Sequence, residues 1–125
     1  MLAAAGRKQR LPAERVLSLY NTHTGESLNT VYWLEGQYLP ESLNNINYLM
    51  RDHRNGEVKD IDARLLELLY QISQRVESQQ PINIISAYRS ETTNAMLAEH
   101  DQRVAKHSLH IQGMAVDLRI PYRDL

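Results

Sequence analysis

The sequence predicts an α+β fold in which a small antiparallel sheet carries helices packed on one side. Three observations support this expectation: an early pair of β-branched and aromatic runs, two helical patterns in the middle of the chain, and short strand-like runs in the second half. Helices alternate with strands without an internal repeat, which is typical of one α+β domain.

The first predicted element is a β-hairpin between Arg15 and Tyr38. Residues 16–20 and 31–34 are mostly aliphatic, β-branched or aromatic, and a polar stretch that contains Gly25 separates them. Residues of these types favour strands, and the glycine favours a turn.

Two helices are predicted next. After Pro40, apolar residues recur at helical spacing, and Asn55-Gly56 is a common helix end. Asp60 or Asp62 can then cap a longer helix that stops before Pro81. The apolar positions are Leu43, Ile46, Leu49 and Met50 in the first helix, and Leu65, Leu66, Leu68, Leu69, Ile72 and Val76 in the second.

The second half of the chain predicts a strand over residues 81–88, a helix over 91–100, a loop over 101–109 and a last strand over 113–120. In this last strand Met114, Val116, Leu118 and Ile120 share one face. Because side chains alternate along a strand, Asp117 should point away from the core.

Length and composition indicate one domain. The chain has 125 residues, 42% hydrophobic and 23% charged, which fits a single core over residues 15–125. Residues 1–14 are expected to be a disordered segment or the remnant of an export signal, because Ala3-Ala4-Ala5 suits the end of such a signal but no apolar core precedes it. No apolar run approaches the roughly 20 residues of a membrane-spanning helix.

The net charge and the absence of cysteine limit which binding partners and which metal ligands the chain can have. A net charge of −1 provides no basic surface for a nucleic acid. The absence of cysteine means that a transition-metal site must be built from histidine and carboxylate.

Such a pair is present in residues 108–117. His110 lies in the loop and Asp117 in the following strand, and a turn at Gly113 would let both side chains reach one ion. Zinc binds imidazole nitrogen and carboxylate oxygen at about 2.0–2.2 Å, and small residues at Gly113 and Ala115 would leave room for water and substrate. The residues alone equally allow a solvated aspartate and a surface histidine.

The pattern Ser-x-His-x-x-Gly-x-Ala-x-Asp, from Ser108 to Asp117, resembles the metal-site motif of the zinc D-alanyl-D-alanine carboxypeptidase and dipeptidase superfamily, whose fold is shared with the hedgehog signalling domain. Residues 85–90 resemble the Ser-Gly-Tyr-Arg-Ser strand end of that superfamily, with Ala87 in place of glycine. Within it the chain resembles the periplasmic murein endopeptidase K family. The residues that carry this second resemblance are Leu19-Tyr20-Asn21-Thr22-His23-Thr24-Gly25-Glu26, Asp60-Ile61-Asp62 and Val104-Ala105-Lys106.

The resemblance implies a zinc metallopeptidase that hydrolyses peptide cross-links between peptidoglycan stem peptides in the periplasm. It implies that His110 and Asp117 are zinc ligands. Arg89 would stabilise an oxyanion or grip a substrate carboxylate, and Ser108 would bind substrate or orient His110. Without the resemblance, a surface salt bridge for Arg89 and a turn role for Ser108 are the ordinary interpretations.

The resemblance also implies a third zinc ligand, a histidine in a later strand, with a carboxylate base shortly before it, and the chain contains neither. One explanation is that the C-terminal strands are missing, which would leave a sheet edge that can pair with a second copy. Others are that His107 or His100 substitutes as a ligand, or that a partner chain completes the site. The alternative functions are therefore a catalytically incomplete zinc- or murein-binding module, and a D-Ala-D-Ala-type carboxypeptidase.

Overall fold

The protein is described from a computed structural model, which describes residues 13–76 and 80–121. Five strands form one sheet in the order β3-β2-β1-β4-β5. Their bounds are Glu14–Asn21 for β1, Ser27–Leu34 for β2, Gln37–Tyr38 for β3, Ile82–Ser86 for β4 and Asp117–Arg119 for β5. The segment 1–14, predicted to precede the domain, lies outside the described residues apart from Ala13 and Glu14.

The hairpin is confirmed, and the sheet is mixed rather than antiparallel. β1 pairs antiparallel with β2, and Leu17 of β1 lies opposite Thr30. β1 pairs parallel with β4, and Leu19 lies opposite Ile82. The sheet was predicted to be antiparallel, and the β1–β4 pair departs from this because the chain crosses through two helices between β3 and β4, and such crossovers join parallel strands.

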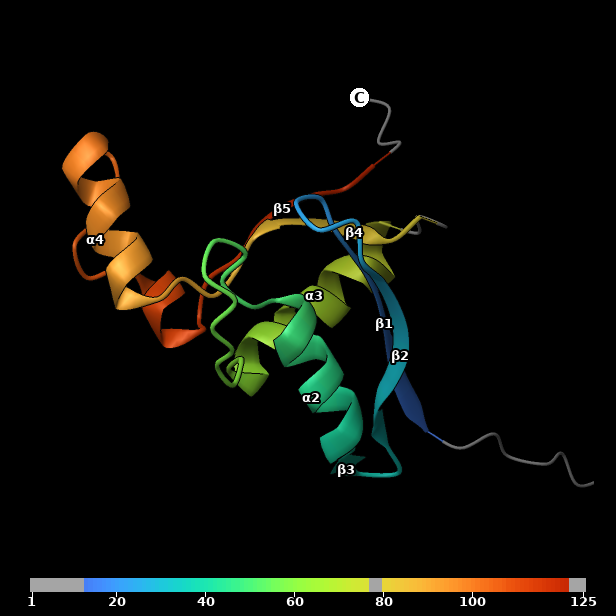
Figure 1. The fold of residues 1–125 in the computed structure, drawn as a ribbon. Helices are drawn as coiled ribbons and strands as arrows, with labels where there is room; N and C mark the ends of the chain where they lie inside the picture. The colour runs from blue at the N-terminus through green and yellow to red at the C-terminus, as the bar shows by residue number, and fades with distance from the viewer. Residues whose placement is uncertain (1–12, 77–79, 122–125) are drawn as a thin grey trace, which may run out of the picture.

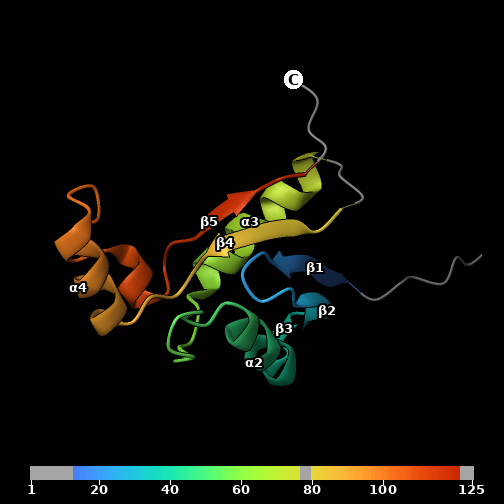
Figure 2. The same cartoon turned by 45° about the horizontal axis from the view of Figure 1, so that its top comes forward.

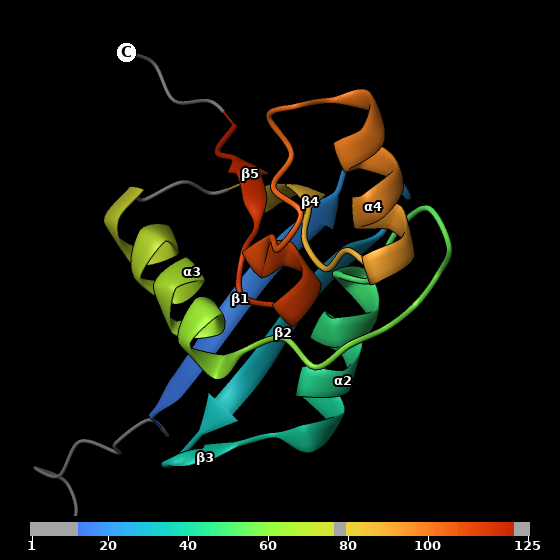
Figure 3. The same cartoon turned by 90° about the vertical axis from the view of Figure 1, so that its left-hand side faces the viewer.

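Within the described residues, three α-helices follow the predicted segments: α2 (Pro40–Leu49), α3 (Ala63–Val76) and α4 (Glu91–His100). α2 and α3 lie on the same side of β1 and β2 (Figures 1 and 3). α4 lies beyond the end of β4, at the opposite end of the molecule from β3 (Figures 1 and 2). The α+β class is thus confirmed, and α2 and α3, but not α4, pack on one side of the sheet as predicted.

α2 ends earlier than the sequence predicts. Its last residue is Leu49, and the backbone N–H of Met50 donates to the carbonyl of Ile46. Asn55-Gly56 is not a helix end but part of a turn, in which the N–H of Gly56 donates to the carbonyl of Asp52 at 2.8 Å. The Asp52 side chain accepts from the N–H groups of Arg54 and Asn55. Such side-chain bonds compete with helical ones, which explains the early end.

α3 confirms one of the two predicted caps. Asp62 precedes its first residue, and Asp62 Oδ1 accepts from the N–H of Arg64 at 2.8 Å. Leu65, Leu66 and Leu69 are buried. Leu68, predicted to belong to the apolar stripe, is 52% exposed, because it lies roughly 100° around the helix from the centre of the buried face.

The core lies between the sheet and these two helices. Its members are buried aliphatic side chains with one tyrosine and one alanine: Leu17, Leu19, Tyr32, Ile46, Leu49, Met50, Ile61, Leu65, Leu66, Leu69, Ile82, Ile84 and Ala87. Within the described ranges no helix has the length and apolar character needed to cross a bilayer.

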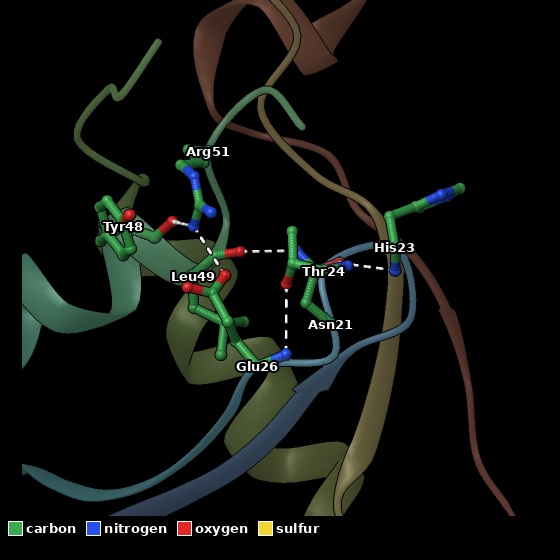
Figure 4. A network of polar contacts seen from close by, with 7 residues as sticks. All are labelled: Asn21, His23, Thr24, Glu26, Tyr48, Leu49 and Arg51. Atoms are coloured by element: carbon green, nitrogen blue, oxygen red, sulfur yellow. Dashed lines mark hydrogen bonds and ion pairs between the residues drawn. The ribbon is translucent and has the colours of Figure 1, made fainter. Parts of the chain in front are cut away.

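A polar network joins the turn between β1 and β2 to the end of α2 (Figure 4). The buried amide of Asn21 donates to the carbonyl of Leu49 at 2.8 Å and accepts from the N–H groups of His23 and Thr24. Arg51 forms a 2.7 Å ion pair with Glu26. The polar residues of this turn thus hold the hairpin against α2.

The last strand is shorter than predicted. β5 contains only Asp117–Arg119, and residues 109–112 form a 3-10 helix, η1 (Leu109–Gln112), at the end of the predicted loop. Gly113 closes η1 in the left-handed conformation with φ 67°. This conformation is incompatible with a strand, so the strand cannot begin at Gly113.

Candidate functional site

The site lies where β4 ends and β5 begins. Asp117 is the first residue of β5 and pairs with Ser86, the last residue of β4. The chain then continues from Ser86 through Ala87 to Arg89. η1 lies between α3 and α4 in front of the sheet (Figure 3) and carries His110. Two motifs that are separate in the sequence therefore meet at one place.

His110 and Asp117 face each other. Nε2 of His110 lies 3.5 Å from Oδ2 of Asp117, and the side chains are 12% and 60% exposed. Asp117 points away from the core, as the alternation along the strand predicted. For a tetrahedral ion with bonds of about 2.0–2.2 Å, two ligand atoms lie about 3.3–3.5 Å apart. The distance fits two ligands on one ion, and it also fits an ion pair without a metal.

The other imidazole nitrogen determines the tautomer. Nδ1 of His110 lies 2.7 Å from the carbonyl oxygen of Ala87. Because a carbonyl only accepts, Nδ1 must carry a proton and donate it. In the neutral ring Nε2 is then an unprotonated acceptor that faces a carboxylate, another acceptor. A metal ion between them would satisfy both acceptors, and such an Nδ1–H bond to a carbonyl is the usual support for a metal-binding histidine.

Ser108 and Gly113 set the backbone around His110. Ser108 precedes η1, and its Oγ accepts from the N–H of His110 at 3.1 Å. A Cβ on Gly113 would lie 2.8 Å from the backbone oxygen of Asp60. Gly113 is buried, so the expectation that it leaves open space for water or substrate was wrong. Its role is close packing against the segment before α3.

Arg89 lies beside this pair. Its backbone N–H donates to the carbonyl of His110 at 3.0 Å, and its Nη1 donates to Oδ1 of Asn94 at 3.0 Å. Its Nε is buried and has no hydrogen-bond partner among the described residues. Burial lowers the pKa of Arg89, while the carboxylate of Asp117 acts in the opposite direction. The guanidinium thus retains a donor for a further acceptor.

The described residues supply two candidate ligands and not a third. Residues 13–76 and 80–121 contain no group of three His, Asp or Glu side chains that could hold a metal ion. His107 and His100, considered as substitutes, therefore do not join His110 and Asp117. The donor set fits zinc in kind, nitrogen with oxygen, and is incomplete in number.

A groove of about 700 Å³ lies between α4 and the segment that leads into η1. Its lining combines two carboxylates, one lysine, one histidine and three apolar side chains: Glu91, Glu99, Lys106, His107, Ala95, Ala98 and Ile111. Glu91 directly follows Ser90 and His107 directly precedes Ser108 in the sequence, so the groove adjoins both motifs.

Two buried polar residues escaped the sequence analysis. Asp52 and Asn94 are each 1% exposed. Asp52 Oδ2 accepts from the backbone N–H of Ser90 at 2.9 Å, and Asn94 contacts Arg89. For Asn94 the sequence signal was that α4 has few apolar positions that could form a core face; for Asp52, in the turn after α2, there was none.

His23 and His53 stack with ring centroids 3.9 Å apart. Burial lowers the pKa of His53, and nearby His23 and Arg54 act in the same direction. The stack joins the turn between β1 and β2 to the turn around Asp52.

Comparison with known proteins identifies relatives. The family model described as peptidoglycan L,D-endopeptidase MepK matches residues 9–125. The peptidoglycan L,D-endopeptidase MepK of Escherichia coli K12 is 38% identical over 109 residues, which cover 87% of this chain and 60% of that protein. The probable enzyme of that name from Haemophilus influenzae is 38% identical over 110 residues, which cover 87% of this chain and 59% of that protein.

The chain spans about 60% of the length of the curated relatives that it matches. No solved structure gives a significant match. Given the family match over nearly the whole chain and this level of identity, the chain belongs to the peptidoglycan L,D-endopeptidase MepK family.

Proposed function

We propose that the protein is a zinc metallopeptidase that hydrolyses L,D peptide bonds in peptidoglycan cross-links, in the periplasm. The observation that carries the proposal is the pairing of His110 Nε2 with Asp117 Oδ2 at 3.5 Å. The names of the relatives, which are peptidoglycan L,D-endopeptidases, support the substrate and its compartment.

In this proposal His110 and Asp117 are two of the metal ligands. The Ala87 carbonyl holds the imidazole so that Nε2 is free to bind a cation. The chemistry that a zinc ion supplies when bound is polarisation of the scissile carbonyl and a lower pKa for water. A third protein ligand and a carboxylate base are expected from outside the described residues, since a catalytic zinc site usually has three protein ligands.

Arg89 is proposed to bind the negative charge of the substrate. Its buried Nε has a free N–H, and its charge faces the side of the site occupied by Asp117. A guanidinium binds carboxylates and oxyanions with two parallel donors. Arg89 can therefore hold a terminal carboxylate of a stem peptide or stabilise the developing oxyanion. Ser108 is proposed to orient His110 through its bond to the His110 N–H.

The groove beside α4 is a proposed place for one stem peptide of the cross-link. It offers carboxylates for ammonium groups and Lys106 for carboxylates. A peptide with both kinds of charge suits such a lining better than an apolar ligand does.

A second candidate function is a zinc- or murein-binding module without peptidase activity. The absence of a third ligand among the residues that the structure describes favours it. The two candidates share the metal pair and differ in turnover.

Zinc titration with a competing chelator tests the metal pair. His110→Ala and Asp117→Ala should each weaken zinc binding by more than about tenfold. His107→Ala is the matched control, because it removes an exposed histidine of the same loop and should leave the affinity unchanged. Equal affinities for all three variants and the parent chain would rule out the pair as ligands.

Digestion of cross-linked muropeptides tests the reaction. Release of monomers from dimers joined by L,D bonds, and not from dimers joined by D,D bonds, supports the endopeptidase. Zinc binding without any release supports the module. Release of a terminal D-alanine instead would assign the carboxypeptidase alternative.

A further inference from the structure

Asn94 occupies an unusual position for an asparagine. It lies in the first turns of α4, and only Thr93 and Asn94 of this helix are buried. The Asn94 side chain is 1% exposed. Burying an amide is unfavourable unless its donors and acceptor are all used. The inward face of α4 is thus polar. The contacts of Asn94 account for the burial of its amide.

The amide of Asn94 bridges the two motifs of the site. Its Oδ1 accepts from Nη1 of Arg89 at 3.0 Å. Its Nδ2 donates to the carbonyls of Ala105 at 2.8 Å and Lys106 at 3.2 Å. Because those carbonyls can only accept, the amide nitrogen must face them and the amide oxygen must face Arg89. The bridge joins the strand-end arginine to the loop that leads into Ser108 and His110.

Asn94, the side chain that accepts from the Arg89 guanidinium, is neutral and does not cancel the positive charge of Arg89. A carboxylate at position 94 would form an ion pair with the guanidinium and compete with any incoming anion. An amide accepts one hydrogen bond and adds no further negative charge to those of Asp117 and Asp52, which already act on the guanidinium. The buried Nε of Arg89 also lacks a partner in the described part of the chain. The guanidinium is therefore held in place by a side chain that does not neutralise it.

We propose that Asn94 is a positioning residue, which orients Arg89 for a carboxylate of the substrate peptide and ties it to the loop that carries His110. This inference rests on the proposed anion-binding role of Arg89. It does not require that the metal pair be complete, because neither the bridge nor the guanidinium uses the metal.

The test uses the metal-free chain labelled with ¹⁵N and follows the Nε–H resonance of Arg89 by NMR, with acetate as the carboxylate probe. Arg89→Lys assigns the resonance by removing it. In the parent chain the resonance should stand apart from those of exposed arginines, and acetate should shift it in a saturable way. A parent chain without any response to acetate would overturn the proposal.

Two substitutions at position 94 separate the positioning of Arg89 from the effect of a negative charge beside it. Asn94→Asp keeps an oxygen for Arg89, adds a negative charge and loses the two bonds to the carbonyls of Ala105 and Lys106. The apparent dissociation constant for acetate should rise at least about tenfold, the order expected when a buried ion pair must be displaced. Asn94→Leu removes the bridge, so the Arg89 resonance should move to the position of the exposed arginines. Met96→Gln, on the exposed side of α4, is the control and should change neither the acetate affinity nor the position of the Arg89 resonance.

Two results with the Asn94 variants would contradict the proposal. An unchanged Arg89 resonance in Asn94→Leu would show that Asn94 serves only the fold, and equal acetate affinities for Asn94→Asp and the parent would refute the argument from neutral charge. If Asn94→Leu does not give a folded spectrum, Asn94→Ser replaces it. Failure of zinc binding or of muropeptide cleavage would count against the proposed function and leave these outcomes untouched.

Discussion

The carboxylate of Asp52 accepts a 2.9 Å hydrogen bond from the backbone N–H of Ser90, across 38 residues of sequence. Ser90 in turn caps α4, since its side chain accepts from the N–H of Thr93. One buried carboxylate thus fixes the segment that carries Arg89 to the turn after α2.

Asp52→Asn should destabilise the protein by about 2–3 kcal/mol, because an amide replaces a buried carboxylate that accepts from several donors. The N–H groups of Ser90 and Arg54 donate to different oxygens of the Asp52 carboxylate. In asparagine an NH₂ group replaces one of these oxygens and cannot accept, so one of the two N–H groups loses its partner. Urea denaturation measures the loss. Asp101→Asn changes an exposed carboxylate in a similar turn and serves as control. A midpoint for Asp52→Asn equal to that of the control would contradict the assigned role.

The same residue predicts part of the acid dependence. Burial alone would raise the pKa of Asp52, but hydrogen bonds from Ser90, Thr93 and Arg54 outweigh it and hold the pKa below the usual value. A carboxylate with a lowered folded pKa contributes stability that is present above about pH 4 and is lost as the pH falls through the folded pKa. The parent chain should therefore lose more stability below about pH 4 than Asp52→Asn does.

Gly113→Ala should destabilise the protein by at least about 2 kcal/mol. The left-handed conformation costs about 1–2 kcal/mol for a residue with a Cβ, and that Cβ would also meet the backbone oxygen of Asp60 at 2.8 Å. Gly56→Ala is the matched control, since Gly56 has φ +81° and no atom within 4 Å of its Cβ position. Thermal denaturation of both should show the larger loss for Gly113. Equal losses would mean that the contact with Asp60 carries no cost.

Ser108→Ala should weaken zinc binding severalfold, the order expected for a residue that orients a ligand, and lower stability by about 1 kcal/mol. The reason is the loss of the 3.1 Å bond from the His110 N–H to Ser108 Oγ. Ser108→Thr keeps the hydroxyl and should behave like the parent chain. Chelator competition measures the affinity. If the alanine and threonine variants bind zinc alike, the hydroxyl does not orient His110.

His53 predicts a further pH effect near neutrality. Its pKa is lowered by burial and by nearby His23, Arg54 and Arg89, while Asp52 acts in the opposite direction. A histidine whose folded pKa is lowered takes up its proton more readily in the unfolded chain, so stability falls as the pH drops below about 6.5 and levels off below the folded pKa.

His53→Phe keeps an aromatic ring against His23 and removes the titration. We expect it to lose less stability than the parent chain between about pH 7.5 and about pH 5.5, as measured by denaturation at the two values. His107→Phe, at an exposed position, is the control. A parent chain and a His53→Phe variant with parallel pH profiles would exclude this histidine as a source of the effect.

The local elements could be predicted from the sequence. The hairpin, α3 with its Asp62 cap, β4 and α4 follow from alternation, helical spacing and capping residues, which act within a few residues of one another. The site was predicted as a pair, His110 with Asp117, because one short segment contains both.

The errors occur where distant segments meet. The sequence predicted that α2 would run to Asn55-Gly56, yet Asp52 stops it by bonding to its own turn and to Ser90. It placed Leu68 in the core, but Leu68 is 52% exposed. Which face of α3 is covered depends on how the helix packs against the sheet, and the sequence does not show this packing. It assigned open space to Gly113, whose close neighbour, Asp60, is far away in the sequence.

The sequence by itself determined which residues form strands and helices and which side chains could bind a metal, because periodicity, capping and ligand chemistry are local properties. Only the tertiary structure decided that β1 and β4 run parallel, that the Ala87 carbonyl directs His110 toward Asp117, and that Asn94 holds Arg89. These contacts depend on how separate segments pack, and a buried polar group takes whatever partner that packing brings within reach.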